Sequence, residues 1–236
     1  ASVATAATLN GAKARPTLAK GPAPLLAAVP RPLPTPAAKL FDVGVSTVTE
    51  TALLLLFLKV SAVLLSKVSP GVTHKVLSQL VWILIIQGSS RLQGVCGQVG
   101  RTKQVLNPNW YAALAKPSWT PPSWAFPLAW IPLKLLQTFA ASLAWAALDR
   151  RVLATPIILF VLHLALGDVW NSQFFLKQRP LTGLFVIATF WGVLLAATFS
   201  LYSASPTAAY LVAPTCVWVL VAASLNLDVW YLNKDR

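Results

Sequence analysis

The sequence predicts an all-α integral membrane protein on the basis of three observations. Hydrophobic residues make up 56% of the chain and charged residues only 11%, a balance typical of membrane proteins rather than soluble domains. Long apolar segments follow one another at short intervals, and each approaches or exceeds the roughly 20 residues that a membrane-crossing helix needs. The basic residues, which give a net charge of +13, lie in tails and short loops. That distribution fits membrane topology and anionic lipids, and we expect no nucleic acid partner.

Residues 1–46 form a basic extension rich in proline and alanine. Such a segment cannot bury enough apolar surface to offset its chain entropy. Up to residue 41 it contains basic residues but no acidic ones, together with many alanine, proline, serine and threonine residues. This composition resembles the end of an organellar targeting region. We therefore expect an organellar membrane location, with the chloroplast favoured over the mitochondrion.

Residues 47–70 predict an extra N-terminal hydrophobic helix, interrupted by Lys59. A lysine at a helix centre costs about 2.5–3.5 kcal/mol on insertion, so a helix lying on the membrane surface is one interpretation. Loop charges favour the other interpretation, in which the helix crosses. Crossing leaves only Lys67, Lys75, Arg150 and Arg151 on one side and gathers the other loop and tail basic residues opposite them. The charges thus favour six crossings over five.

Residues 76–234 contain five further apolar segments, at about 76–99, 122–148, 152–175, 181–203 and 207–232. A stretch rich in tryptophan and proline, from Trp110 to Trp130, begins in the loop between the first two segments and leads into the second. Proline stiffens the backbone and removes hydrogen-bond donors. Tryptophan favours membrane interfaces and the mouths of apolar pockets. The loop is therefore either a rigid aromatic lip beside a helix or an interfacial belt that anchors one.

The loop resembles the first loop of the TspO/MBR family, the tryptophan-rich sensory proteins and mitochondrial translocator proteins. That family carries WY-x-x-L-x-KPSW-x-PP followed by a VW or AW pair, and this chain matches it from Trp110 to Pro122 and at Ala129-Trp130. Trp170 and Phe174-Phe175 resemble the family's W-x-x-x-FF, and Pro214, Trp218, Asn226 and Asn233 resemble positions of its last helix. The resemblance implies a TspO/MBR-like five-helix transmembrane bundle over residues 76–234.

The resemblance also implies an aromatic-lined cavity that binds a tetrapyrrole, of porphyrin or haem type, or a similar amphipathic ligand, for sensing, transport or scavenging. Flat aromatic faces and proline rings offer stacking area to a planar macrocycle. Trp130 and Trp218 match the family tryptophans that line the cavity and are implicated in light-dependent porphyrin breakdown. The other matching positions are Tyr111, Trp119, Pro121, Phe174, Phe175 and Ala222. The alternative is a helical core that is merely rich in tryptophan and phenylalanine.

Three ionisable residues inside the predicted helices, Lys134, His163 and Asp168, need compensation for their burial. Lys134 is either a grip for the carboxylate of an amphipathic ligand or the partner of Asp168 or of another subunit. His163 is either a haem ligand or a hydrogen-bonded packing residue. The family often places tyrosine at position 134, asparagine at 167 and tyrosine at 215, where this chain has Lys134, Gly167 and Thr215. These departures leave the identity of the ligand open.

The chain shows no glycine loop for phosphate, no nucleophile elbow and no clustered metal ligands. It therefore predicts no required cofactor and no enzyme, apart from the porphyrin breakdown that the resemblance allows. Val229, Tyr231 and Lys234 fit a loose sterol-recognition pattern, so a sterol-like ligand is an alternative to an interfacial belt. Membrane lipids are expected partners. The rival function is an accessory subunit of a large chloroplast or mitochondrial membrane complex, docked through residues 1–70.

Overall fold

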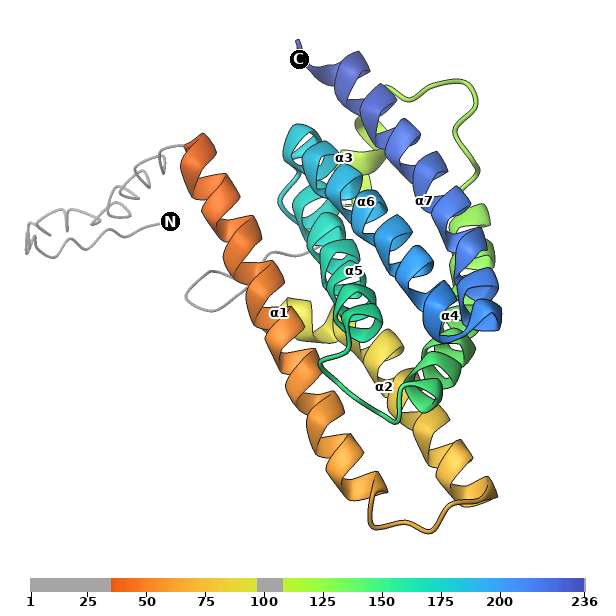
Figure 1. Ribbon diagram of the computed structural model, residues 1–236. Coiled ribbons are helices and arrows are strands. Elements are labelled where there is room, and N and C mark those ends of the chain that lie inside the picture. Colours follow the sequence, from red (N-terminus) through yellow and green to blue (C-terminus); the bar gives the residue numbers. More distant parts are fainter. Residues whose placement is uncertain (1–34, 97–107, 236) are drawn as a thin grey trace, which may run out of the picture. The chain divides into compact units, whose positions relative to one another are not determined.

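The computed structural model describes residues 35–96 and 108–235, with side chains of 90–96 and 108 left aside. Every regular element in these residues is helical, which confirms the predicted all-α class. Residues 1–34 of the basic extension lie outside the described residues, whereas residues 36–46 belong to α1. The elements are α1 (Pro36–Leu65), α2 (Val72–Cys96), α3 (Pro108–Ala113), α4 (Ala125–Ala147), α5 (Thr155–Asn171), the π-helical turn η1 (Ser172–Leu176), α6 (Pro180–Ala204) and α7 (Pro206–Asn233) (Figure 1).

Helix α1 begins at Pro36, eleven residues before the predicted start at residue 47. The hydroxyl of Thr35 accepts a hydrogen bond from the amide of Ala38 (3.2 Å) and so caps the helix. Pro36 has no backbone N–H, so it leaves no unpaired donor in the first turn. At 30 residues the helix is about 45 Å long, so its first turns extend beyond a hydrocarbon core of about 30 Å. The polar residues Lys39 and Asp42 therefore belong to the helix without having to lie in lipid.

Four described helices are long and apolar enough to cross a membrane, namely α1, α5 with η1, α6 and α7. Their length and apolar composition are those of an integral membrane protein. Helix α2 has 25 residues and α4 has 23, but polar residues lower their hydropathy, and α4 also contains Pro132. The predicted count of six crossings stays a prediction.

The long helices pack as a closed ring of neighbours. Helix α5 packs on α6, α6 on α7, α7 on α4, α4 on α2, and α1 closes the ring by packing on both α2 and α5 (Figure 1). Helix α5 is the most buried of the four candidate spans. Where α2, α4 and α5 meet, the ring of Trp82 makes edge-to-face contacts with Trp145 (5.9 Å) and Phe160 (5.7 Å), a favourable aromatic geometry.

Helices α6 and α7 approach closely at Gly183. A Cβ atom at this position would lie 3.0 Å from Asn226 Oδ1 and 3.3 Å from Phe174 Cβ, so only glycine fits without displacing a neighbour. The buried Asn226 side chain accepts from the indole N–H of Trp170 (3.0 Å) and donates to the carbonyl of Pro180 (2.9 Å). One side chain of α7 thus fixes the end of α5 and the start of α6.

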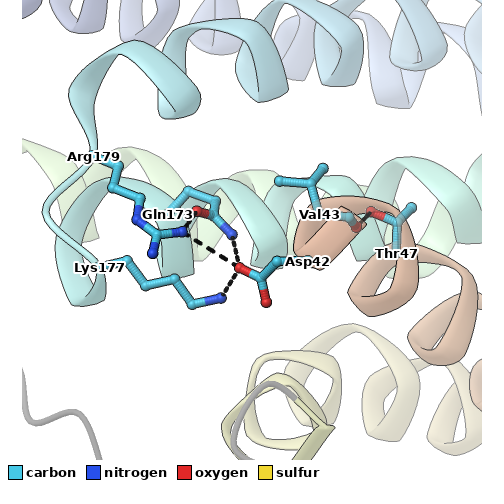
Figure 2. A network of polar contacts seen from close by, with 6 residues as sticks. All are labelled: Asp42, Val43, Thr47, Gln173, Lys177 and Arg179. Atoms are coloured by element: carbon cyan, nitrogen blue, oxygen red, sulfur yellow. Dashed lines mark hydrogen bonds and ion pairs between the residues drawn. The ribbon is translucent and has the colours of Figure 1, made fainter. Parts of the chain in front are cut away.

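Helix α1 is fastened to the turn between α5 and α6 by the buried carboxylate of Asp42 (Figure 2). Its Oδ2 accepts from Lys177 Nζ (2.5 Å) and Gln173 Nε2 (3.0 Å) and lies 3.6 Å from Arg179 Nη1. Only 4% of the Lys177 side chain and 7% of the Asp42 side chain are exposed. The network therefore stands in place of water for both charges and joins the extra helix to the rest of the bundle.

Candidate functional site

A cavity of about 290 Å³ lies among α2, α4, α5 and α6. Its mouth is at the protein surface, because the lining residue Asn171 is exposed and Trp130 is half-buried. The walls combine aromatic and aliphatic surface with a few polar groups, as in many small-molecule sites. The lining residues are Ile86, Ser89, Trp130, Lys134, Gln137, His163, Leu164, Gly167, Asp168, Trp170, Asn171 and Phe190.

Lys134 supplies the positive charge of this cavity. Its ammonium donates to the main-chain carbonyl of Ile86 (3.2 Å). The charge of Asp168 is close enough to interact with it, and both residues line the cavity. The hydrogen-bond acceptor of Lys134 is thus a neutral carbonyl, and the predicted ion pair between Lys134 and Asp168 stays a prediction. A carbonyl competes only modestly for an ammonium, so a ligand carboxylate can replace it.

Behind Asp168 lies Glu50 of α1, a residue to which the sequence alone assigned no role. Ser89 hydrogen-bonds to Asp168, and the carboxyl group of Glu50 interacts with that of Asp168. Glu50 is fully buried. Among the described residues neither of its carboxyl oxygens has a close hydrogen-bond partner, and the same is true of Asp168 Oδ2, so the carboxyl group of Asp168 is what faces Glu50. An acidic residue within an apolar helix is costly, and that cost is the sequence signal that could have pointed to Glu50.

His163 lies deeper in the same cavity, packed between two phenylalanine rings. Its ring is 4.5 Å from that of Phe160 and stacks on Phe190 at 6.1 Å, and only 1% of the residue is exposed. Within residues 35–96 and 108–235, no three metal-ligating side chains come together. The ring contacts favour His163 as a packing residue of the cavity wall, but among the described residues neither ring nitrogen has the predicted hydrogen bond. Its ligation of haem iron stays a prediction.

Trp218 faces a different space from Trp130. It lines a shallow groove of about 300 Å³ between α4 and α7, together with Pro132, Pro214 and neighbouring apolar residues, and its ring lies 6.0 Å from that of Phe126. Ala222 is buried one turn further along α7. The structure therefore does not bring the two predicted cavity tryptophans into one cavity, but distributes them over the two sides of α4.

The predicted residues Tyr111, Phe174 and Phe175 form an aromatic cluster at the end of α5. The ring of Tyr111 lies 6.2 Å from Phe174 and 5.5 Å from Phe175, and Lys116 Nζ lies 4.7 Å from the Tyr111 centroid. Burial raises the pKa of Tyr111 above its usual value near 10, so the phenol stays neutral at physiological pH. The π-helical turn places Phe174 in the core, 6.0 Å from Trp170 of the cavity wall.

The loop that carries Trp119 and the half-buried Pro121 is fastened to the end of α7. The side chain of Asn233 accepts from the amide of Ala115 (3.0 Å) and donates to its carbonyl (2.9 Å). The indole N–H of Trp119 donates to Asp228 Oδ2 (3.0 Å), while 45% of Trp119 remains exposed. The loop thus forms an anchored aromatic lip at one end of the bundle.

Comparison with known proteins connects this geometry to a family. Residues 90–232, more than half of the chain, match the model of the TspO/MBR family. The chain belongs to the TspO/MBR family. Protein CrtK of Rhodobacter capsulatus is 31% identical over 143 residues, which cover 60% of this chain and 89% of that protein. The translocator protein of Sus scrofa is 33% identical over 130 residues, covering 54% and 77%. The tryptophan-rich protein TspO of Archaeoglobus fulgidus is 36% identical over 128 residues, covering 52% and 80%.

The TspO/MBR match excludes α1 and most of α2. Asp42 and Glu50 therefore come from a helix that precedes the matched region, yet they contact residues within it. Position 167, where the family often has asparagine, is glycine here, and a Cβ atom would lie 3.3 Å from the ring of Phe190. Thr215, where tyrosine is frequent, is buried and accepts a hydrogen bond from Gln137 (3.2 Å). Gly167 thus lines the cavity around Lys134 directly, whereas Thr215 contacts the lining residue Gln137.

Proposed function

We propose that this membrane protein binds a tetrapyrrole, or a planar amphipathic acid of similar shape, in the cavity among α2, α4, α5 and α6. The observation that carries the proposal is the presence of one ammonium group, Lys134, in a cavity walled by Trp130, Trp170 and Phe190. A membrane-buried cation needs compensation. Asp168 in the same cavity supplies part of it, and a ligand carboxylate would supply a direct charged acceptor in place of the Ile86 carbonyl. The sensory and translocator proteins among its relatives are consistent with such a role.

Binding follows from two physical terms. The aromatic faces stack on the macrocycle and remove it from water, while Lys134 exchanges its bond to the Ile86 carbonyl for a charge-assisted bond to a carboxylate. The volume lies at the lower end of the range for small-molecule sites, so part of the macrocycle extends through the mouth beside Asn171. No step requires a metal, and the porphyrin is a ligand rather than a resident cofactor.

The first prediction separates the two tryptophans. Titration of the detergent-solubilised protein with protoporphyrin IX, followed by Soret absorbance and tryptophan fluorescence, is expected to show saturable binding near one equivalent. Trp130→Ala removes a stacking face of the cavity and is expected to weaken binding by about tenfold. Trp218→Ala, on the other side of α4, is the matched control and should change affinity less than twofold. Equal weakening by both substitutions would contradict this location.

The second prediction concerns Lys134. Lys134→Leu is expected to weaken binding of the free diacid by about tenfold or more and binding of the dimethyl ester less than twofold, because the ester carries no charge to neutralise. Lys134→Arg keeps the cation and should retain preference for the acid. An equal loss for acid and ester would show that Lys134 only shapes the cavity, and absence of saturable binding in folded protein would reject the function itself.

The rival proposal is an accessory subunit of a large chloroplast or mitochondrial membrane complex, with the chloroplast favoured. It draws on α1, whose outward face carries the exposed residues Leu53, Leu56, Phe57 and Val60 and lies outside the matched region. Such a surface faces lipid or another subunit equally well. Native electrophoresis of gently solubilised organelle membranes tests it. Migration with a complex many times the mass of this chain would favour the subunit role, and migration as a small species would reject it.

A further inference from the structure

A third hollow lies where the beginning of α1, the beginning of α6 and the end of α7 meet. Its volume is about 570 Å³, and it shares no lining residue with the cavity around Lys134. The first turns of α1 form one wall, residues 178–189 the second, and the last turn of α7 the third. Because α1 lies outside the family-matched region, this groove depends on the extra helix.

Among the described residues, three charged side chains line the groove and each is positive: Lys39, Arg179 and Lys234. Asp42 pairs with Arg179 and Lys177, so it offsets part of this charge from behind. Lys39 and Lys234 therefore supply the net positive charge of the groove. Asp235, next to Lys234, is exposed and does not line the groove. The first turn of α6 contributes the positive end of its helix dipole at the same place. The groove therefore favours an anion at this end.

The remainder of the groove is apolar. Leu40, Val43, Leu181, Phe185 and Val186 supply its walls. Leu40 and Phe185 are 66% and 63% exposed, which continues the apolar surface outward onto the sides of α1 and α6. From Pro180 to Thr189 the wall advances about 14 Å along α6. A long apolar trough with cations at one end is complementary to a molecule that has an anionic head and an aliphatic chain.

The position along the helices identifies the source of such a molecule. Helix α1 is longer than the hydrocarbon core, and the groove lies at its beginning, where the membrane interface is expected. Trp230 lines the groove as well, and tryptophan is enriched at that depth. We propose that the groove binds an anionic phospholipid, with its phosphate against Lys39, Lys234 and Arg179 and an acyl chain along α1 and α6. The lipid then joins α1 to the family-like bundle.

Native mass spectrometry of the full chain with equimolar phosphatidylglycerol and phosphatidylcholine tests the proposal. We expect retention of one phosphatidylglycerol in preference to phosphatidylcholine. Lys39→Gln with Lys234→Gln is expected to weaken phosphatidylglycerol binding by about 25-fold, roughly fivefold for each lysine. Lys67→Gln with Lys75→Gln removes the same charge beyond the other end of α1 and should change it less than twofold. Arg179 is not substituted because it also pairs with Asp42.

A second variant tests the apolar part without changing any charge. Thr182→Trp places a large ring in the groove and is expected to weaken phosphatidylglycerol binding by about tenfold or more, because the acyl chain loses its place. Porphyrin titration reports on the other cavity and should be unchanged, which separates misfolding from loss of this site. Equal retention of both lipids, equal loss in the lysine control pair, or full competition by glycerol 3-phosphate would overturn the proposal.

Discussion

Asp42→Ala is expected to lower the free energy of unfolding by about 3–5 kcal/mol, the range measured when one partner of a buried ion pair is removed. The substitution removes the carboxylate that accepts from Lys177 and Gln173 and lies beside Arg179 (Figure 2). Lys177 then remains in a site where 4% of its side chain is exposed. Unfolding of the purified protein in mixed detergent and SDS micelles, followed by circular dichroism, measures the change.

The matched control is Asp149→Asn, which removes an equal charge from an exposed turn where φ is 50°. Asparagine tolerates that conformation, so the expected change is within about 0.5 kcal/mol. The double substitution Asp42→Leu with Lys177→Leu should recover much of the loss, because it removes both buried charges together. A loss below about 1 kcal/mol for Asp42→Ala, or an equal loss for Asp149→Asn, would show that the network contributes little to stability.

The fold was predictable because it depends on short-range features of the sequence, namely apolar length and the residues at helix ends. Apolar length gives helices, and prolines such as Pro36, Pro180 and Pro206 stand at helix beginnings, where they are tolerated. The start of α1 was not predicted because Lys39 and Asp42 interrupt the apolar run, although Thr35 and Pro36 form a cap signal. Asp42 can lie in α1 because Lys177 pairs with it, and Lys177 is 135 residues away in the sequence.

The candidate site was harder to predict, because neither composition nor motif spacing gives the direction of a side chain. Trp130 and Trp218 match the same family cavity by position. In the structure, Trp130 of α4 lines the cavity around Lys134, whereas Trp218 of α7 lines the groove between α4 and α7. Glu50 lies outside the matched region, so the family resemblance was silent about it. Only the packing of α1 on α5 brings Glu50 against Asp168. Long-range packing therefore determines which polar residues meet in this bundle.

Glu50→Leu is expected to raise the free energy of unfolding by about 1–3 kcal/mol, the cost of burying a polar group without a hydrogen-bond partner. Glu50 is fully buried, and among the described residues neither of its carboxyl oxygens has a close hydrogen-bond partner. The charged group that interacts with it is another carboxyl, Asp168. Leucine has a similar volume and continues the buried stripe formed by Leu54 and Leu58. The same micelle unfolding measurement applies.

Glu50→Gln is the control that separates charge from polarity. The amide keeps the size of the side chain and its unmet hydrogen bonds but cannot ionise, so its stability should fall between those of the glutamate and leucine proteins. Destabilisation by Glu50→Leu would mean that this carboxyl group has a favourable partner in the membrane. Substitution of Asp42 is thus expected to lower the free energy of unfolding and substitution of Glu50 to raise it, although both are buried acids of α1. The reason is that three polar side chains surround the carboxylate of Asp42, whereas a second carboxyl faces that of Glu50.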